Sequence, residues 1–197
     1  LVEFLQMFLD LAADILSQGR TSRLYRRLIH DRRTAADVVA AQSSRGLVSL
    51  RLAPLKLSDV IAETVEQLQD TIAAKRHTLN VSISLDEPLV SGDRTRLVQV
   101  LGNLVGNATR YTPEDGAITV SLGHDGGKVF VTVADNGIGI AADKMANLFD
   151  LYSQVEANSE RNSGGLGLGL ALVRSMMQLH SGSASAASAG EGAGSTF

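Results

Sequence analysis

Two short segments of alternating apolar and polar residues constrain the fold most strongly. Residues 117–123, AITVSLG, and residues 128–135, KVFVTVAD, are joined by the four residues HDGG. Alternation of this kind is typical of a strand with one buried face, and two such runs across a short glycine-containing linker predict a β-hairpin. The chain therefore needs a sheet with antiparallel pairing, and its apolar face must be covered by other elements.

The sequence after Pro54 supplies these covering elements. Apolar residues at helical spacing predict helices over 57–77 (with Ser58 as N-cap), 93–111, 141–148 and 166–180. Further strands are expected over 78–84, 182–188 and 194–197, with a turn at 91–93. Helices and strands do not alternate as they do in a βαβ fold. We therefore expect the α+β class, as a two-layer sandwich of helices on a mixed, largely antiparallel sheet.

The first part of the chain has a different organisation, and Pro54 marks a plausible boundary. Helices are expected over 3–17 and 21–30, then short strands over 35–44 and 46–52. We expect residues 1–53 to form a small helix-helix-strand-strand appendage and residues 54–197 to form the main domain. Because the chain begins without Met and ends inside a strand signal, we interpret it as a fragment that is truncated at its C-terminus.

Composition limits the function classes. The net charge is −3, which gives no reason to expect nucleic acid or an anionic membrane as a partner. There is no cysteine, so disulfides and thiolate metal sites are excluded, and a reducing, cytoplasmic compartment fits. The apolar opening segment is too short and too acidic for a membrane span and lacks the features of a signal peptide.

The helix over 93–111 carries Asn103 and Asn107 one turn apart, beside an apolar face formed by Leu97, Leu101, Leu104, Val105 and Ala108. Asparagine is a poor helix former because its amide competes for backbone hydrogen bonds. A stripe of amides suits the wall of a cleft that faces a ligand or a metal. A solvent-exposed face that is rich in amides explains the same pattern about equally well.

Two glycine-rich segments strengthen the case for a ligand site. In VADNGIGI, Asp135 ends a strand and Gly137 and Gly139 follow, so the carboxylate could accept a hydrogen bond from a ligand amine close to the backbone. A common Asp-Asn-Gly turn is the alternative. In GGLGLGLALV, backbone amides before a helix could cradle a phosphate. This segment matches neither a Walker A loop nor a dinucleotide fingerprint, and a flexible loop is the alternative.

The order of these motifs is more specific than any one of them. Together with LFDLYSQ at 148–154 and GAGSTF at 192–197, the sequence over 52–197 resembles the catalytic ATP-binding domain of bacterial sensor histidine kinases. That family shares a superfamily with gyrase, Hsp90 and MutL. The resemblance implies a Bergerat-type ATP-binding fold, with ATP and Mg²⁺ as cofactors. It also implies a cytoplasmic domain, which could belong to a membrane-anchored kinase.

The resemblance implies a role for each matching residue. Asn107 would be the metal residue and ligate Mg²⁺, while Arg110 and Tyr111 would approach the phosphates or ribose. Asp135 would accept a hydrogen bond from the adenine amino group. The polar segment 150–165 would form a lid over ATP, and Phe149 would anchor its base or simply pack in the core. The remaining backbone contacts with the nucleotide would come from Gly137, Gly139, Gly165, Leu166, Gly167, Leu168 and Gly169.

Asn103 separates two activities within the superfamily. Members that hydrolyse ATP resemble one another in having a glutamate at this position, where it acts as general base on water. An amide cannot take that proton. The resemblance therefore implies a protein histidine kinase, with Asn103 and Asn107 as catalytic residues, that passes the phosphoryl group to a histidine and hydrolyses ATP slowly.

The phosphoacceptor histidine is not apparent in the chain. HDRRTA at His30 resembles a phosphoacceptor motif, but the residues after it are expected to form strands, whereas the family continues in a helix. We expect the phosphoacceptor domain and the response regulator to act in trans or to lie in a missing part of the protein. The alternative is an ATP-binding module without kinase activity.

Residues 8–50 resemble a different family, the insulinase and pitrilysin-like zinc metallopeptidases, in a non-catalytic segment. The motif H-x-x-E-H of those enzymes is absent from this chain, so no peptidase activity is implied. A gene fusion, a truncated open reading frame and an artefact of sequence assembly would each explain how this segment is joined to the rest of the chain. A structural remnant of a peptidase is a third, weaker interpretation of the whole chain.

Overall fold

The computed structural model describes residues 49–84, 86–150 and 169–197. One compact unit extends from Leu50 to Phe197. The predictions for residues 1–48 lie outside the described residues, and so do His30 and nearly all of the peptidase-like segment. The first described strand, β1 (Ala53–Leu55), crosses the boundary placed between residues 53 and 54, and the division into domains stays a prediction.

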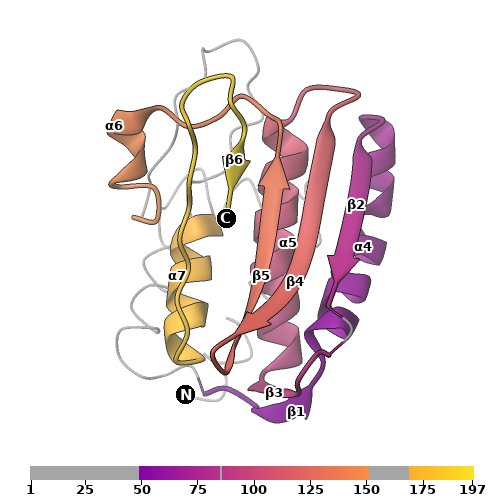
Figure 1. Ribbon diagram of the computed structural model, residues 1–197, viewed down its shortest axis with the longest axis vertical. Coiled ribbons are helices and arrows are strands. Elements are labelled where there is room, and N and C mark those ends of the chain that lie inside the picture. The colour runs from indigo at the N-terminus through magenta and orange to yellow at the C-terminus, as the bar shows by residue number, and fades with distance from the viewer. Residues whose placement is uncertain (1–48, 85, 151–168) are drawn as a thin grey trace, which may run out of the picture. The chain divides into compact units, whose positions relative to one another are not determined.

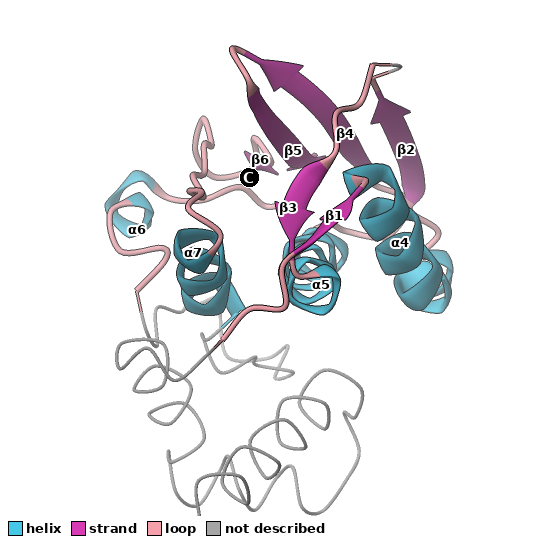
Figure 2. Ribbon diagram, turned by 90° about the horizontal axis from the view of Figure 1, so that it is seen from below, coloured by secondary structure: helices cyan, strands magenta, loops and turns pink. Residues whose placement is uncertain are grey.

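The described part of this unit has two main layers, a four-stranded sheet and three longer helices (Figures 1 and 2). It also contains a two-stranded sheet and one short helix. The strand order of the four-stranded sheet is β2 (Thr78–Ile83), β4 (Ala117–Asp125), β5 (Lys128–Asp135) and β6 (Ser195–Thr196). β2 and β4 run parallel, and the other two pairs are antiparallel. One face is covered by α4 (Leu57–Ala74), α5 (Arg94–Tyr111) and α7 (Gly169–Leu179). The predicted α+β sandwich on a mixed sheet is confirmed.

The hairpin predicted from the alternating segments is β4–β5, with Gly126 and Gly127 at positive φ in its turn. Alternate residues of β4 point into the core, where Ile118 and Val120 are buried. The predicted apolar face of α5 is also confirmed, since its residues are all buried: Leu97, Leu101, Leu104, Val105 and Ala108. The core therefore lies between the sheet and α5, the central helix of the layer (Figure 2).

The start of α5 differs from the prediction. Residues 91–93 were expected to form a turn, but β3 (Val90–Gly92) pairs antiparallel with β1. Asp93 then caps the helix, because its side chain accepts the backbone N–H of Arg96 at 3.2 Å. The strand expected over 46–52 is not formed by its described residues, 49–52, since the first strand in the described part of the chain begins at Ala53.

The start of α4 also differs. Ser58 was predicted to be the N-cap, but the helix already begins at Leu57, and Lys56 at the N-cap makes no side-chain cap. Instead, Oε1 of Glu87 accepts the backbone N–H of Ser58 at 2.8 Å. Partial burial raises the pKa of Glu87, but hydrogen bonds from Ser58 and Leu57 and the charge of Lys56 bring it below its usual value. A carboxylate from a distant part of the sequence therefore accepts a hydrogen bond from a free backbone N–H at the start of α4.

The C-terminal strands are shorter than predicted. β6 contains only two residues, and the region around 182–188 contributes a single bridge between Ala187 and Thr196. Gly190, Gly192 and Gly194 have positive φ, which interrupts extended structure between them. The short helix expected over 141–148 is α6 (Ala142–Met145). Within residues 49–84, 86–150 and 169–197, no helix has both the length and the apolar character that a membrane crossing requires.

Candidate functional site

The asparagine stripe of α5 faces the start of α7. Asn103 and Asn107 are half-buried and share one face of the helix. A Cβ atom added at Gly169, the first residue of α7, would lie 3.2 Å from Oδ1 of Asn103. Figure 2 shows α5 between α4 and α7, so this stripe lies on the side of α5 away from α4. Asn103 thus faces α7, and Asn107 lies one turn further along the same half-buried face of α5.

Asp135 is held in one orientation by two hydrogen bonds. It is the last residue of β5, and its Oδ1 accepts the backbone N–H of Gly137 at 2.8 Å. Its Oδ2 accepts the hydroxyl of Ser195 at 2.6 Å. Each carboxylate oxygen has two lone pairs, so both oxygens can still accept a further donor. This arrangement makes Asp135 a rigid, pre-oriented acceptor.

Asp135 is one of the residues that line a pocket of about 380 Å³. The rest of its lining comes from the C-terminal segment, namely Ala187, Ser188, Ala189, Ala193, Gly194, Ser195 and Thr196. A pocket of this size falls within the range for small-molecule sites. Its walls are small side chains and backbone, so a flat ring could approach the main chain closely.

The loop after Asp135 depends on its glycines. A Cβ atom at Gly137 would lie 2.6 Å from the carbonyl oxygen of Tyr111, and one at Gly139 would overlap the carbonyl oxygen of Gly190. Gly139 also has φ +71°, a conformation that favours glycine. The backbone N–H of Gly192 donates to the carbonyl of Ile138 at 2.7 Å. The loop is therefore packed between the end of α5 and the C-terminal segment.

Arg110 and Tyr111 stand at the end of α5, beside this loop. The guanidinium carbon of Arg110 lies 5.5 Å from the centroid of the Tyr111 ring, which is exposed. The backbone N–H of Ile138 donates to the carbonyl of Tyr111 at 3.2 Å. The structure thus brings the end of α5 together with the loop after Asp135, and the nucleotide contacts of these two side chains stay predictions.

Phe149 has an observed packing role. Its ring meets the ring of Phe197 edge-on, with centroids 6.5 Å apart. Next to it, Asp150 pairs with Arg174 of α7 at 3.3 Å. The predicted residues Gly165, Leu166, Gly167 and Leu168, and the predicted lid beyond Asp150, lie outside the described residues.

Two hydroxyl residues of the site, Ser195 and Ser188, were not among the predicted residues. Ser195 orients Asp135, and Ser188 receives the backbone N–H of Ile140 at 3.0 Å while donating to the carbonyl of Gly194 at 2.6 Å. The available signal was the GSTF segment, which places a serine directly after the last glycine. That segment was predicted as a strand and as one of the ordered motifs, without a role for its serine.

The described residues contain no group of three or more His, Cys, Asp or Glu side chains that could hold a metal. Mg²⁺ does not need such a group, because it usually retains waters and takes substrate phosphate oxygens with only one or two protein ligands. The half-buried amide of Asn107 supplies a suitable oxygen. These residues therefore fit a magnesium ion that arrives with a phosphate ligand.

Residues 92–197 match the family model described as histidine kinase-, DNA gyrase B- and HSP90-like ATPase. The chain is 38% identical over 113 residues to the adaptive-response sensory kinase SasA of Thermosynechococcus vestitus. This match covers 57% of the chain but only 30% of that kinase. The chain thus spans less than a third of the length of this relative.

Two solved structures have the same fold. The catalytic domain of histidine kinase ThkA, in a nucleotide-free form, has a TM-score of 0.63 and 26% identity, covering 75% of this chain and 93% of that domain. Full-length ShkA in complex with AMPPNP has a TM-score of 0.71 and 24% identity, covering 100% of this chain and 44% of ShkA. In the second case the likeness concerns the fold alone.

Proposed function

Because the chain belongs to the family of histidine kinase-, DNA gyrase B- and HSP90-like ATPases, we propose that it binds Mg-ATP as the catalytic domain of a two-component sensor kinase. The observation that supports this most is the carboxylate of Asp135, held by Gly137 and Ser195 at the edge of a pocket. A fixed acceptor in such a place is suited to an exocyclic amine on a flat ring.

In this proposal, adenine lies against the loop after Asp135 and donates its amino hydrogen to that carboxylate. Gly137 and Gly139 lack the Cβ atoms that would collide with the carbonyl oxygens of Tyr111 and Gly190, so the loop can pack tightly next to the proposed position of the base. The phosphates extend toward the asparagine stripe and the start of α7, where Arg110 contributes positive charge and Gly165–Gly169 contribute backbone amides. Asn107 ligates Mg²⁺, which neutralises charge on the phosphates when it is bound.

Asn103 favours transfer over hydrolysis. The side chain of Asn103 on α5 lies next to Gly169 at the start of α7, but its amide cannot remove a proton from water. We propose that the terminal phosphoryl group passes to an imidazole nitrogen of a histidine, so that an N–P bond forms, the O–P bond breaks and ADP leaves. The site contributes mainly positioning and charge stabilisation to this step. The acceptor domain and a response regulator are the proposed partners, in trans or in a further part of the protein.

Binding is tested first. The chain is titrated with AMPPNP, with and without Mg²⁺, by calorimetry. We expect binding that depends on Mg²⁺ in the unaltered chain and a loss of that dependence in Asn107→Ala. Gln69→Ala, which truncates an exposed amide on α4, is the matched control and should bind like the unaltered chain. Equal Mg²⁺ dependence in Asn107→Ala would contradict the metal assignment.

Transfer is tested with labelled ATP and a separate phosphoacceptor domain. We expect acid-labile label on the acceptor and slow release of free phosphate. Tight binding of AMPPNP without transfer to any acceptor would support the alternative, a nucleotide-binding module without kinase activity. Rapid phosphate release without an acceptor would contradict the role assigned to Asn103.

A further inference from the structure

The last turn of α5 has its backbone carbonyls satisfied by a side chain from another helix end. The final four carbonyls of a helix have no partner within it. Nζ of Lys75, the C-cap residue of α4, lies 2.7 Å from the carbonyl oxygen of Thr109 and 2.9 Å from that of Arg110. A third oxygen, that of Thr112, lies at 3.4 Å. A cation at this end also opposes the negative pole of the helix dipole.

The next carbonyl connects the helix end to the candidate site. The carbonyl of Tyr111 accepts the backbone N–H of Ile138 at 3.2 Å. Gly137, the preceding residue, packs so closely on this carbonyl that an added Cβ would lie 2.6 Å away. Gly137 in turn donates its N–H to Oδ1 of Asp135. The place of the helix end therefore determines the place of the loop that orients Asp135.

Lys75 contacts α5 from the end of α4, whereas Asn103 of the asparagine stripe faces the start of α7. α4 and α7 flank α5 in both views of the molecule (Figures 1 and 2), and Asn103 faces Gly169 at the start of α7. The ammonium group therefore acts on the site through the backbone carbonyls that it contacts. The backbone carbonyl of Lys75 also accepts the N–H of Asp115 at 3.0 Å, which joins the turn after α4 directly to the turn after α5.

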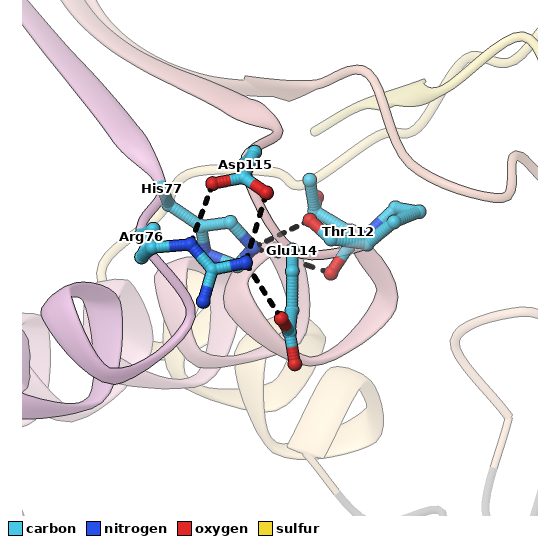
Figure 3. A network of polar contacts seen from close by, with 6 residues as sticks. Arg76, His77, Thr112, Glu114 and Asp115 are labelled. Atoms are coloured by element: carbon cyan, nitrogen blue, oxygen red, sulfur yellow. Dashed lines mark hydrogen bonds and ion pairs between the residues drawn. The ribbon is translucent and has the colours of Figure 1, made fainter.

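Two neighbours of Lys75 hold the segment just after α5 (Figure 3). Nε2 of His77 donates to the carbonyl oxygens of Thr112 and Pro113 at 3.2 and 2.9 Å. Arg76 pairs with Asp115 at 2.7 Å and with a second carboxylate, that of Glu114. The Arg76 side chain is 61% exposed, and exposed pairs contribute little because solvent and salt screen them. Of the side chains of Lys75, Arg76 and His77, that of Lys75 is the one that contacts carbonyls of α5 itself.

We propose that Lys75 is a positioning residue for nucleotide binding. Its ammonium group fixes the last turn of α5 and, through the carbonyl of Tyr111, the loop that orients Asp135. The nucleotide part of this inference rests on the proposed function, whereas the ordering of the loop does not. Charged hydrogen bonds to carbonyl groups are among the stronger polar contacts, so their loss should measurably increase the rate of hydrogen exchange at the Ile138 amide.

The test compares Lys75→Met, which keeps the length of the side chain without its charge, with Arg76→Gly. Arg76 has φ +54°, a conformation that glycine adopts freely, so this control removes the exposed ion pairs without backbone strain. In Lys75→Met we expect the Ile138 amide to exchange its hydrogen about tenfold faster and Mg-AMPPNP to bind about tenfold more weakly. Arg76→Gly should stay within about twofold on both measurements.

Hydrogen exchange at amides in the middle of β4 and β5 distinguishes a local change at Ile138 from a change in the stability of the whole domain. Faster exchange at Ile138 with unchanged exchange in β4 and β5 supports positioning, whereas an equal increase at all amides means general destabilisation and overturns it. Unchanged exchange at Ile138 and unchanged affinity in Lys75→Met also overturn it. Should Lys75→Met not fold, Lys75→Gln, which keeps two N–H donors, is measured instead and should show a smaller change of the same kind.

The same experiment distinguishes this inference from the proposed function. If the unaltered chain fails to bind Mg-AMPPNP, the proposed function is wrong, and exchange at Ile138 alone decides whether Lys75 orders the loop. If the unaltered chain binds and Lys75→Met binds equally well, only the role of Lys75 is wrong.

Discussion

The hydroxyl of Ser195 donates a 2.6 Å hydrogen bond to Oδ2 of Asp135, across 60 residues of sequence. With the N–H of Gly137 on Oδ1, this bond gives the carboxylate one donor on each oxygen. A carboxylate held in this way loses little side-chain freedom when it accepts a further hydrogen bond. Pre-orientation of this kind lowers the entropic cost of binding.

Ser195→Ala should therefore weaken nucleotide binding without abolishing it. A hydrogen bond to a charged group contributes about 1.5–3 kcal/mol, but the N–H of Gly137 still holds the other oxygen in this variant. We therefore expect only part of that energy to be lost from binding, and the Kd for Mg-AMPPNP to rise about three- to tenfold. Ser195→Thr keeps the hydroxyl and should bind nearly as the unaltered chain does. The measurement is competition with a fluorescent ATP analogue, and equal affinities for all three proteins would show that the bond does not orient Asp135 for binding.

Gly139→Ala should destabilise the domain. Its φ of +71° disfavours alanine, and the new Cβ would overlap the carbonyl oxygen of Gly190. We expect a loss of more than about 1 kcal/mol in the free energy of unfolding, measured by urea denaturation. Gly102→Ala is the control, because this position is helical and an added Cβ meets no atom within 4 Å. It should stabilise the domain by about 0.5–1 kcal/mol. A larger free energy of unfolding for Gly139→Ala than for Gly102→Ala would contradict this account.

The fold was largely predictable because its signals are local. The alternation in β4 and β5 and the apolar face of α5 each follow from one short segment, and the structure confirms both. Contacts between distant segments were not predictable. Glu87 caps α4 from another loop, which makes Ser58 unnecessary as an N-cap. Pairing with β1 makes Ser91 and Gly92, two residues of the predicted turn, part of a strand.

In the candidate site, too, local signals were predictable and contacts between distant segments were not. The motifs placed Asn103, Asn107 and Asp135 on the elements where the structure has them. The partners that support these residues come from other parts of the chain, as Ser195 does for Asp135 and Lys75 does for the end of α5. No periodicity or turn signal marks such residues, because each acts through a contact that only the complete fold creates.

The cap on α4 predicts a pH dependence. The pKa of Glu87 is below its usual value of 4.5 in the folded domain, so its contribution to stability is present above that pH. It is lost as the pH falls through the folded pKa, because the protonated carboxyl no longer caps the helix as an anion. We therefore expect Glu87→Gln to be less stable than the unaltered chain at neutral pH and to approach it below the usual pKa. Urea unfolding across this range measures the difference, and a constant gap between the two proteins would exclude the capping role.

The most direct test of the central claim compares ATP with ITP, which carries a carbonyl oxygen where adenine carries its amino group. An ionised Asp135 can accept from the amine but repels the carbonyl oxygen, so the unaltered chain should prefer Mg-ATP by at least about tenfold. Asp135→Asn adds an amide donor and should lower the affinity for ATP and remove or reverse the preference. Calorimetric titration of both proteins with both nucleotides decides the matter: equal binding of ATP and ITP by the unaltered chain, or an undiminished preference for ATP in Asp135→Asn, would contradict the assignment of Asp135 to the adenine site.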